Sequence, residues 1–146
     1  MKTFPLRVLA FQLRREEAEV SESLTTARRR HEQDLVALGS AQTGLQGVLE
    51  QGRQLLAGSS FSDRRLQWEQ ITSWTDYQAQ QVDAAGAEAE KSRRAMEEAI
   101  QAMRLIRQRG DVLERRRQQW QSALEQEIEN KLHRELDEMA GGRLRG

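Results

Sequence analysis

The chain has 146 residues, of which 32% are charged and only 5% aromatic, with one proline, no cysteine and a formal net charge of zero. The absence of cysteine excludes a disulfide framework and thiolate metal sites, and the balanced charge lacks the basic excess typical of nucleic-acid binding. The mean hydropathy of −0.82 and the shortage of aromatic residues exclude a large compact core. Because strong helix formers dominate and proline is nearly absent, we expect long helices rather than disorder.

The first predicted helix runs from about Pro5 to Leu56, with Thr3 as its N-cap and the proline tolerated in the first turn. Apolar residues three and four positions apart form the a/d seam of a coiled coil, interrupted at Glu17 and Asp34. His31 lies on this seam and is interpreted as a polar residue tolerated in the core. The seam comprises Ala10, Leu13, Val20, Leu24, Ala27, His31, Leu38, Ala41, Leu45, Val48 and Leu55.

A break follows at residues 57–60, where the sequence reads Ala-Gly-Ser-Ser. Ser60 and Asp63 resemble a capping box and predict that a second helix starts at Phe61. This helix is expected to end at about Ala140, with Gly141 and Gly142 as its C-cap. Its seam comprises Trp68, Ile71, Val82, Ala85, Ala89, Met96, Ala99, Met103, Ile106, Leu113, Trp120 and Leu124.

A short turn between two long amphipathic helices predicts an all-α fold: one antiparallel coiled-coil hairpin that forms a single domain over residues 1–146. Folding at residues 58–59 makes the numbers of facing residues sum to about 118. Leu6 then faces about Val112, so the second helix overhangs the first by roughly 28 residues, or about 40 Å. The overhang carries a thin apolar row that a solitary helix does not need, which predicts a contact surface. The row comprises Trp120, Leu124, Ile128, Leu132 and Met139.

The hairpin end combines glycines in the first helix with large side chains in the second. By the same arithmetic, Gly39, Gly44, Gly47 and Gly52 fall near the segment that contains Trp68, Ile71, Trp74 and Tyr77. Two compatible interpretations remain: the large side chains pack against the glycines, or this aromatic end binds a partner.

Basic clusters also coincide across the predicted pair, with residues 28–30 near residues 91–94. A solvated charged face and a docking band for an acidic protein are both compatible with this pattern. Arg115, Arg116 and Arg117, at the start of the overhang, form the most exposed cluster and the best docking candidate.

The sequence offers no motif for catalysis. Nucleophile motifs, phosphate-binding glycine loops and metalloprotease helix motifs are all absent, so we expect no enzyme, no catalytic residue and no cofactor. His133 shares a helical face with Glu129 and Asp137, and ion pairing is its expected role rather than metal binding.

The end of the chain, MEEAIQAMRLIRQRGDVLERRRQQWQSALEQEIENKLHRELDEMAGGR, is similar to the C-terminal helix of the FliJ family of flagellar export proteins. An arginine-rich heptad helix leads to a glutamate-rich stretch, then to Leu136–Ala140 (LDEMA) and the basic residue Arg143. The opening FPLRVLAFQLRREEAEV resembles the aromatic-x-Leu entry of the same family. The YscO-like stalk proteins of injectisomes share this layout.

The resemblance implies a non-enzymatic cytoplasmic stalk of a type III export apparatus, either flagellar or injectisome-type. Such a stalk enters the pore of a hexameric export ATPase, stimulates it, contacts the membrane export gate and recycles substrate chaperones. It implies a monomer in isolation, peripheral to the inner membrane at most, without nucleic acid. By position, the ATPase-contact candidates are Arg115, Arg116, Arg117, Trp120, Leu124, Ile128 and Leu132. The gate-contact candidates are Trp68, Ile71, Trp74 and Tyr77.

One alternative from a different class stays open. The chain is also compatible with a structural or scaffolding coiled coil, or with a holdase-like helical chaperone. In that case Leu124, Ile128 and Leu132 would be buried against a second copy.

Overall fold

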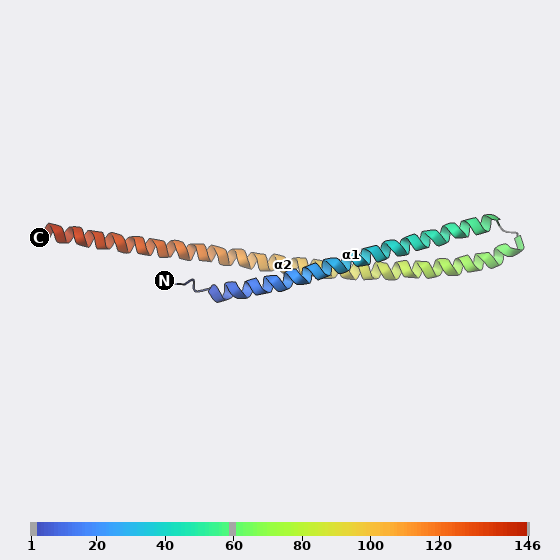
Figure 1. Cartoon of the computed structure of the whole chain (residues 1–146), viewed down its shortest axis with the longest axis horizontal. Coiled ribbons are helices and arrows are strands. Elements are labelled where there is room, and N and C mark those ends of the chain that lie inside the picture. The colour runs from blue at the N-terminus through green and yellow to red at the C-terminus, as the bar shows by residue number, and fades with distance from the viewer. Residues whose placement is uncertain (1–2, 59–60, 146) are drawn as a thin grey trace. The chain divides into compact units, whose positions relative to one another are not determined.

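The computed structural model describes residues 3–58 and 61–145, without the side chains of residues 61, 62 and 143–145. It contains two helices, α1 (Arg7–Gly58) and α2 (Phe61–Arg145), coloured from blue to green and from green to red in Figure 1. Their facing residues run in opposite directions along the chain, which confirms the predicted all-α helical hairpin. Over the residues described, neither helix has a stretch apolar and long enough to span a bilayer.

The start of α1 differs from the prediction. The Arg7 backbone N–H donates to the Phe4 carbonyl at 3.1 Å, so residues 4–7 form a turn with Pro5 at its second position. Proline is favoured there because its fixed φ suits the turn. Thr3 therefore precedes a turn rather than capping a helix, and α1 begins at Arg7.

The predicted C-cap at Gly141 and Gly142 is wrong, because α2 continues through both residues to Arg145. Over residues 3–58 and 61–145, no glycine adopts a positive φ. Glycine permits the left-handed cap but does not impose it. The break also starts later than expected, since α1 includes Ala57 and Gly58. Ser60 lies outside the described residues.

Packing divides the chain into two compact units. The reversal unit is Val20–Ala102 and holds the end of α1 and the start of α2. The terminal unit combines Met1–Glu19 with Met103–Gly146.

The helices of the reversal unit pack in a register that differs from the predicted one. Ile71 lies against Gly52, and His31 lies 3.1 Å from Ser92. In both pairs the residue numbers sum to 123, rather than to the expected value of about 118. Two heptad seams mesh only at registers about seven residues apart. A sum of about 118 would place the apolar Leu24 opposite the charged Arg94, which does not mesh the two seams. The position of the turn alone therefore does not determine the register.

The aromatic side chains of the reversal unit do not fill the space beside the glycines. Trp68 is 60% exposed, and Trp74 and Tyr77 are exposed as well. Gln67, one position earlier, is half-buried in the place predicted for Trp68. The packing interpretation is therefore wrong for the three aromatic residues and holds only for Ile71.

Other parts of the predicted seams are confirmed. Ala89 in the reversal unit and Met103 and Ile106 in the terminal unit are buried. Leu55 is exposed instead, while Gly52 is buried and Leu56 half-buried, so the seam of α1 ends on those two residues.

Two glycines in the middle of α1 have open space where a side chain would stand. A Cβ added at Gly39 or Gly47 would meet no atom within 4 Å. We expect Gly39→Ala and Gly47→Ala each to raise the free energy of unfolding by about 1 kcal/mol, because alanine favours the helix. Urea unfolding followed by circular dichroism measures this change. A loss of stability in either variant would contradict the open environment.

Candidate partner-binding site

The terminal unit ends its helix-to-helix packing at an aromatic pair. The rings of Phe4 and Trp120 lie with centroids 5.7 Å apart and planes tilted by 57°. From Glu125 to Ala140 every residue is exposed. We call residues 121–145 the projection; at 1.5 Å per residue its roughly 25 residues extend about 38 Å. The overhang therefore starts later than the predicted position near Val112, because Trp120 is still covered.

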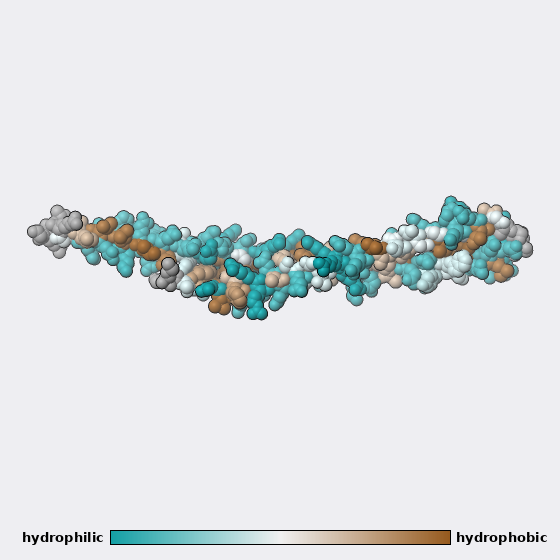
Figure 2. Space-filling model, viewed as in Figure 1, coloured by the Kyte–Doolittle hydropathy of each residue, from teal (hydrophilic) through white to brown (hydrophobic). Residues whose placement is uncertain are grey.

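The projection carries a row of exposed apolar residues, visible as brown atoms along the C-terminal part of α2 in Figure 2. Each is 53–60% exposed. We call this row the projection stripe; it comprises Ile128, Leu132, Leu136 and Met139. Leu136 was missing from the predicted row, although its spacing of four from Leu132 is a signal that the sequence contains.

The projection stripe does not continue the seam that faces α1. From Trp120 and Leu124, a heptad continues to Glu127, Lys131 and Arg134, which are polar. From Ile128 to Leu136 the stripe instead advances by four residues at a time, and each such step turns it by about 40° around the helix; Met139 follows three residues later. A helix that packs on a ridge of this spacing crosses at about −50°. The projection therefore suits a partner helix that crosses it at an angle better than a helix that continues the lengthwise packing of α1.

Three of the predicted ATPase contacts share one hollow on the side of α2. Trp120, Leu124 and Ile128 line it together with the polar residues Gln121, Glu125, Glu127 and Lys131. All of its walls come from α2. Leu132 follows Ile128 one turn further along. The structure therefore brings the apolar candidates together on one continuous surface.

The arginines of the predicted docking cluster differ in whether they form an ion pair within the chain. Arg117 donates from Nε and Nη2 to the Glu114 carboxylate, at 3.0 and 2.7 Å. These hydrogen bonds lower the pKa of Glu114 and raise the pKa of Arg117. Arg115 and Arg116 are exposed and have no ion pair among the described residues. Those two side chains are the ones available to an acidic partner.

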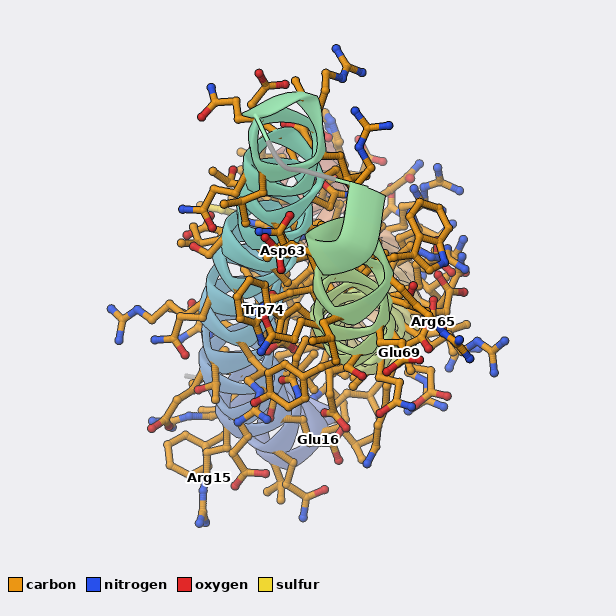
Figure 3. The ribbon with its side chains drawn as sticks, turned by 90° about the vertical axis from the view of Figure 1, so that its right-hand side faces the viewer. Arg15, Glu16, Asp63, Arg65, Glu69 and Trp74 are labelled. Atoms are coloured by element: carbon orange, nitrogen blue, oxygen red, sulfur yellow. The ribbon has the colours of Figure 1, made fainter. Side chains whose placement is uncertain are left out.

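The gate-contact candidates lie on α2 in the reversal unit. Trp68, Trp74 and Tyr77 present exposed side chains, whereas Ile71 is buried against Gly52. Figure 3 shows Trp74 on the same helix as Arg65 and Glu69, whose side chains approach to 4.0 Å. Only the three aromatic candidates are therefore accessible to a partner.

The charged residues in the middle of the chain form pairs on the surface. Arg93 donates to Glu90 and Glu97, and its hydrogen bond lowers the pKa of Glu90 to about 2. Arg30 approaches Glu88 of the other helix at 3.9 Å. Exposed pairs of this kind add little stability. The arrangement suits a solvated charged face, and a docking band stays a prediction.

The two histidines have different surroundings. Buried Ser92 donates its hydroxyl hydrogen to the Ala89 carbonyl at 3.0 Å, so its oxygen accepts from Nδ1 of His31 at 3.1 Å. This contact confirms His31 as a polar residue in the core. Nε2 of His133 lies 4.0 Å from Glu129, and no three potential metal ligands cluster within residues 3–58 and 61–145.

Comparison of the chain with models of protein families, with curated proteins and with solved structures finds no match. The likeness to the FliJ family therefore stays a prediction from the sequence. The case for a binding function rests on the exposed projection stripe, the hollow beside it and the unpaired arginines.

Proposed function

We propose that the protein is a non-enzymatic stalk of a type III export apparatus, flagellar or injectisome-type. In this proposal it binds and stimulates the hexameric export ATPase and links it to the export gate and to substrate chaperones. In this proposal it works in the cytoplasm and is peripheral to the inner membrane at most. The resemblance of both ends of the chain to the FliJ family and the hairpin fold support this assignment.

The projection stripe is the observation that carries the proposal. A solitary helix in water has no reason to keep four large apolar side chains exposed, and such surfaces mark binding sites. From Leu124 to Leu136 the apolar ridge turns by about 120° around the helix. Contacts that point in several directions suit a helix surrounded by subunits of a ring better than a helix lying on one flat surface.

Deletion of residues 121–146 tests the proposal. We expect the shortened chain to keep a folded hairpin, because the Phe4–Trp120 pair is retained. We expect it to lose the stimulation of ATP hydrolysis by a cognate export ATPase, measured by phosphate release. The substitutions Ile128→Ser and Leu132→Ser together should reduce stimulation in the full chain.

Leu35→Ser with Val36→Ser provides the matched control, since these two apolar residues are also exposed but lie in the reversal unit. This control chain should stimulate like the wild type. Undiminished stimulation by the shortened chain would contradict the assignment of the projection.

The scaffolding alternative predicts a stable dimer through the projection. The projection contains six acidic and four basic residues, a net charge of −2, which weakly opposes pairing of two projections with each other. Analytical ultracentrifugation distinguishes the functions. A monomer supports the stalk, whereas a dimer dispersed by Ile128→Ser and Leu132→Ser supports the scaffold.

A further inference from the structure

A second surface of the terminal unit combines apolar and basic side chains. Beside the contact between α1 and α2 lies an open groove of about 430 Å³. Its exposed apolar part consists of Leu9 of α1 and Leu105 and Val112 of α2, beside the half-buried Leu6 and Leu113, and Arg109 and Arg116 lie along it. We call it the Arg-lined groove. It is separate from the hollow beside the projection stripe.

Three of the apolar residues of the groove are not needed for packing within the hairpin. Leu9, Leu105 and Val112 are 50–55% exposed and lie outside both seams. Leu105 and Val112 are seven residues apart and so share one face of α2. A contiguous exposed apolar patch in a small protein indicates a contact with another molecule.

The arginines of the groove lack counter-charges. Arg109 and Arg116 are exposed and form no ion pair with any residue that the structure describes. A second groove in the same unit differs: its Arg117 is held by Glu114, and Glu17 lies beside Arg14 in its lining. Charge is therefore compensated in one groove and uncompensated in the other.

We propose that the Arg-lined groove binds an acidic amphipathic helix of a partner protein. The apolar face of that helix packs on Leu9, Leu105 and Val112. Carboxylates seven residues apart on the same helix pair with Arg109 and Arg116, because those arginines are themselves seven residues apart. Arginine is suited to this role, since its planar guanidinium can hold a carboxylate through two hydrogen bonds. The groove shares Arg116 with the candidate ATPase contacts, but the proposal needs no export function.

A second copy of the chain fits the groove less well. Its projection has an apolar stripe, but its acidic residues, at positions 125, 127, 129, 135, 137 and 138, include no two that are seven residues apart. The groove repeats every seven residues, in Leu105 and Val112 and in Arg109 and Arg116. A helix whose carboxylates repeat every seven residues stays aligned with the two arginines, whereas the carboxylates of the projection do not.

The test uses the full chain and two synthetic helical peptides with leucine at heptad positions a and d. One peptide carries glutamate at positions e and g, and its twin carries lysine there. Fluorescence anisotropy of the labelled peptides measures binding. We expect the acidic peptide to bind and the basic twin not to. Arg109→Glu with Arg116→Glu should weaken binding about tenfold or more, as removal of paired charges does at interfaces.

Arg104→Glu with Arg107→Glu is the matched control, because it changes the net charge equally on the same helix without altering the groove lining. It should weaken binding less than Arg109→Glu with Arg116→Glu does, because the side chains of Arg104 and Arg107 do not line the groove. Leu105→Ser with Val112→Ser is a second route: both residues are exposed, so folding is retained and binding should fall. Circular dichroism checks each variant.

Several results would overturn the proposal. If Arg109→Glu with Arg116→Glu weakens peptide binding no more than Arg104→Glu with Arg107→Glu does, the peptide is attracted by the net charge of the chain alone. Equal binding of the basic twin, or no binding of the acidic peptide, would remove the proposed chemistry. Self-association abolished by Arg109→Glu with Arg116→Glu would assign the groove to a second copy.

Discussion

Gly52→Ala is expected to destabilise the wild-type hairpin but to stabilise a hairpin that already carries Ile71→Ala. A Cβ at position 52 would stand 2.8 Å from Cγ2 of Ile71, a β-branched methyl group that cannot turn away easily. Overpacking of this kind costs about 1–3 kcal/mol, which exceeds the gain of about 1 kcal/mol in helix propensity. Without the Ile71 methyl groups, only the gain in propensity remains.

Urea unfolding of the four chains in this double-mutant cycle measures the effect. Ile71→Ala alone should cost about 2–5 kcal/mol, as for a buried aliphatic side chain cut to alanine. The coupling between the two positions should equal the cost of overpacking, about 1–3 kcal/mol. Gly47→Ala is the control, because its Cβ meets nothing and should stabilise both backgrounds equally. An effect of Gly52→Ala with the same sign in both backgrounds would contradict the packing.

Asp34→Leu is expected to raise the free energy of unfolding by about 2 kcal/mol. The Asp34 side chain is only 13% exposed on the seam of α1, and its Oδ2 has no hydrogen-bond partner among the described residues. An unpaired buried polar group costs about 1–3 kcal/mol. Leucine removes that cost and extends the apolar seam. The lost contact from Oδ1 to Nε of Arg30, at 3.5 Å, is worth little because Arg30 is largely exposed.

Asp34→Asn serves as the control, since it keeps the shape and the polar atoms but removes the charge. We expect it to give less than half the gain of Asp34→Leu, because its amide still lacks a full set of partners. Thermal unfolding of the three chains orders them directly. If the leucine variant unfolds at a lower temperature than the wild type, the carboxylate contributes more than the structure indicates.

The helices and their packed faces could be predicted from the sequence because a heptad repeat needs only local spacing. That reasoning correctly places Ala89, Met103 and Ile106 in the core. The register could not be predicted, because it depends on how glycines of one helix admit side chains of the other, as Gly52 admits Ile71. Trp68 was predicted to lie in the seam because it is hydrophobic. In the structure Gln67 takes that position, because the register of the two helices decides which side chain faces the other helix.

The candidate sites were predictable to different degrees. An overhang follows from the unequal lengths of the two helices, and Ile128 and Leu132 are exposed there as expected. The Arg-lined groove was missed because a search along the a/d seam disregards apolar residues outside it. Leu105 and Val112 could have been found by a search for a second heptad repeat on the same helix.

The spacing of the projection stripe couples two motions of any molecule that follows it. The apolar ridge has the geometry of a screw thread: each step of four residues advances about 6 Å along the axis and turns by about 40°. A partner that moves along the projection and stays in contact with the ridge must therefore rotate about the helix axis by about 7° for each ångström of movement. Displacement along this helix and rotation about it are thus linked by the positions of a few aliphatic side chains.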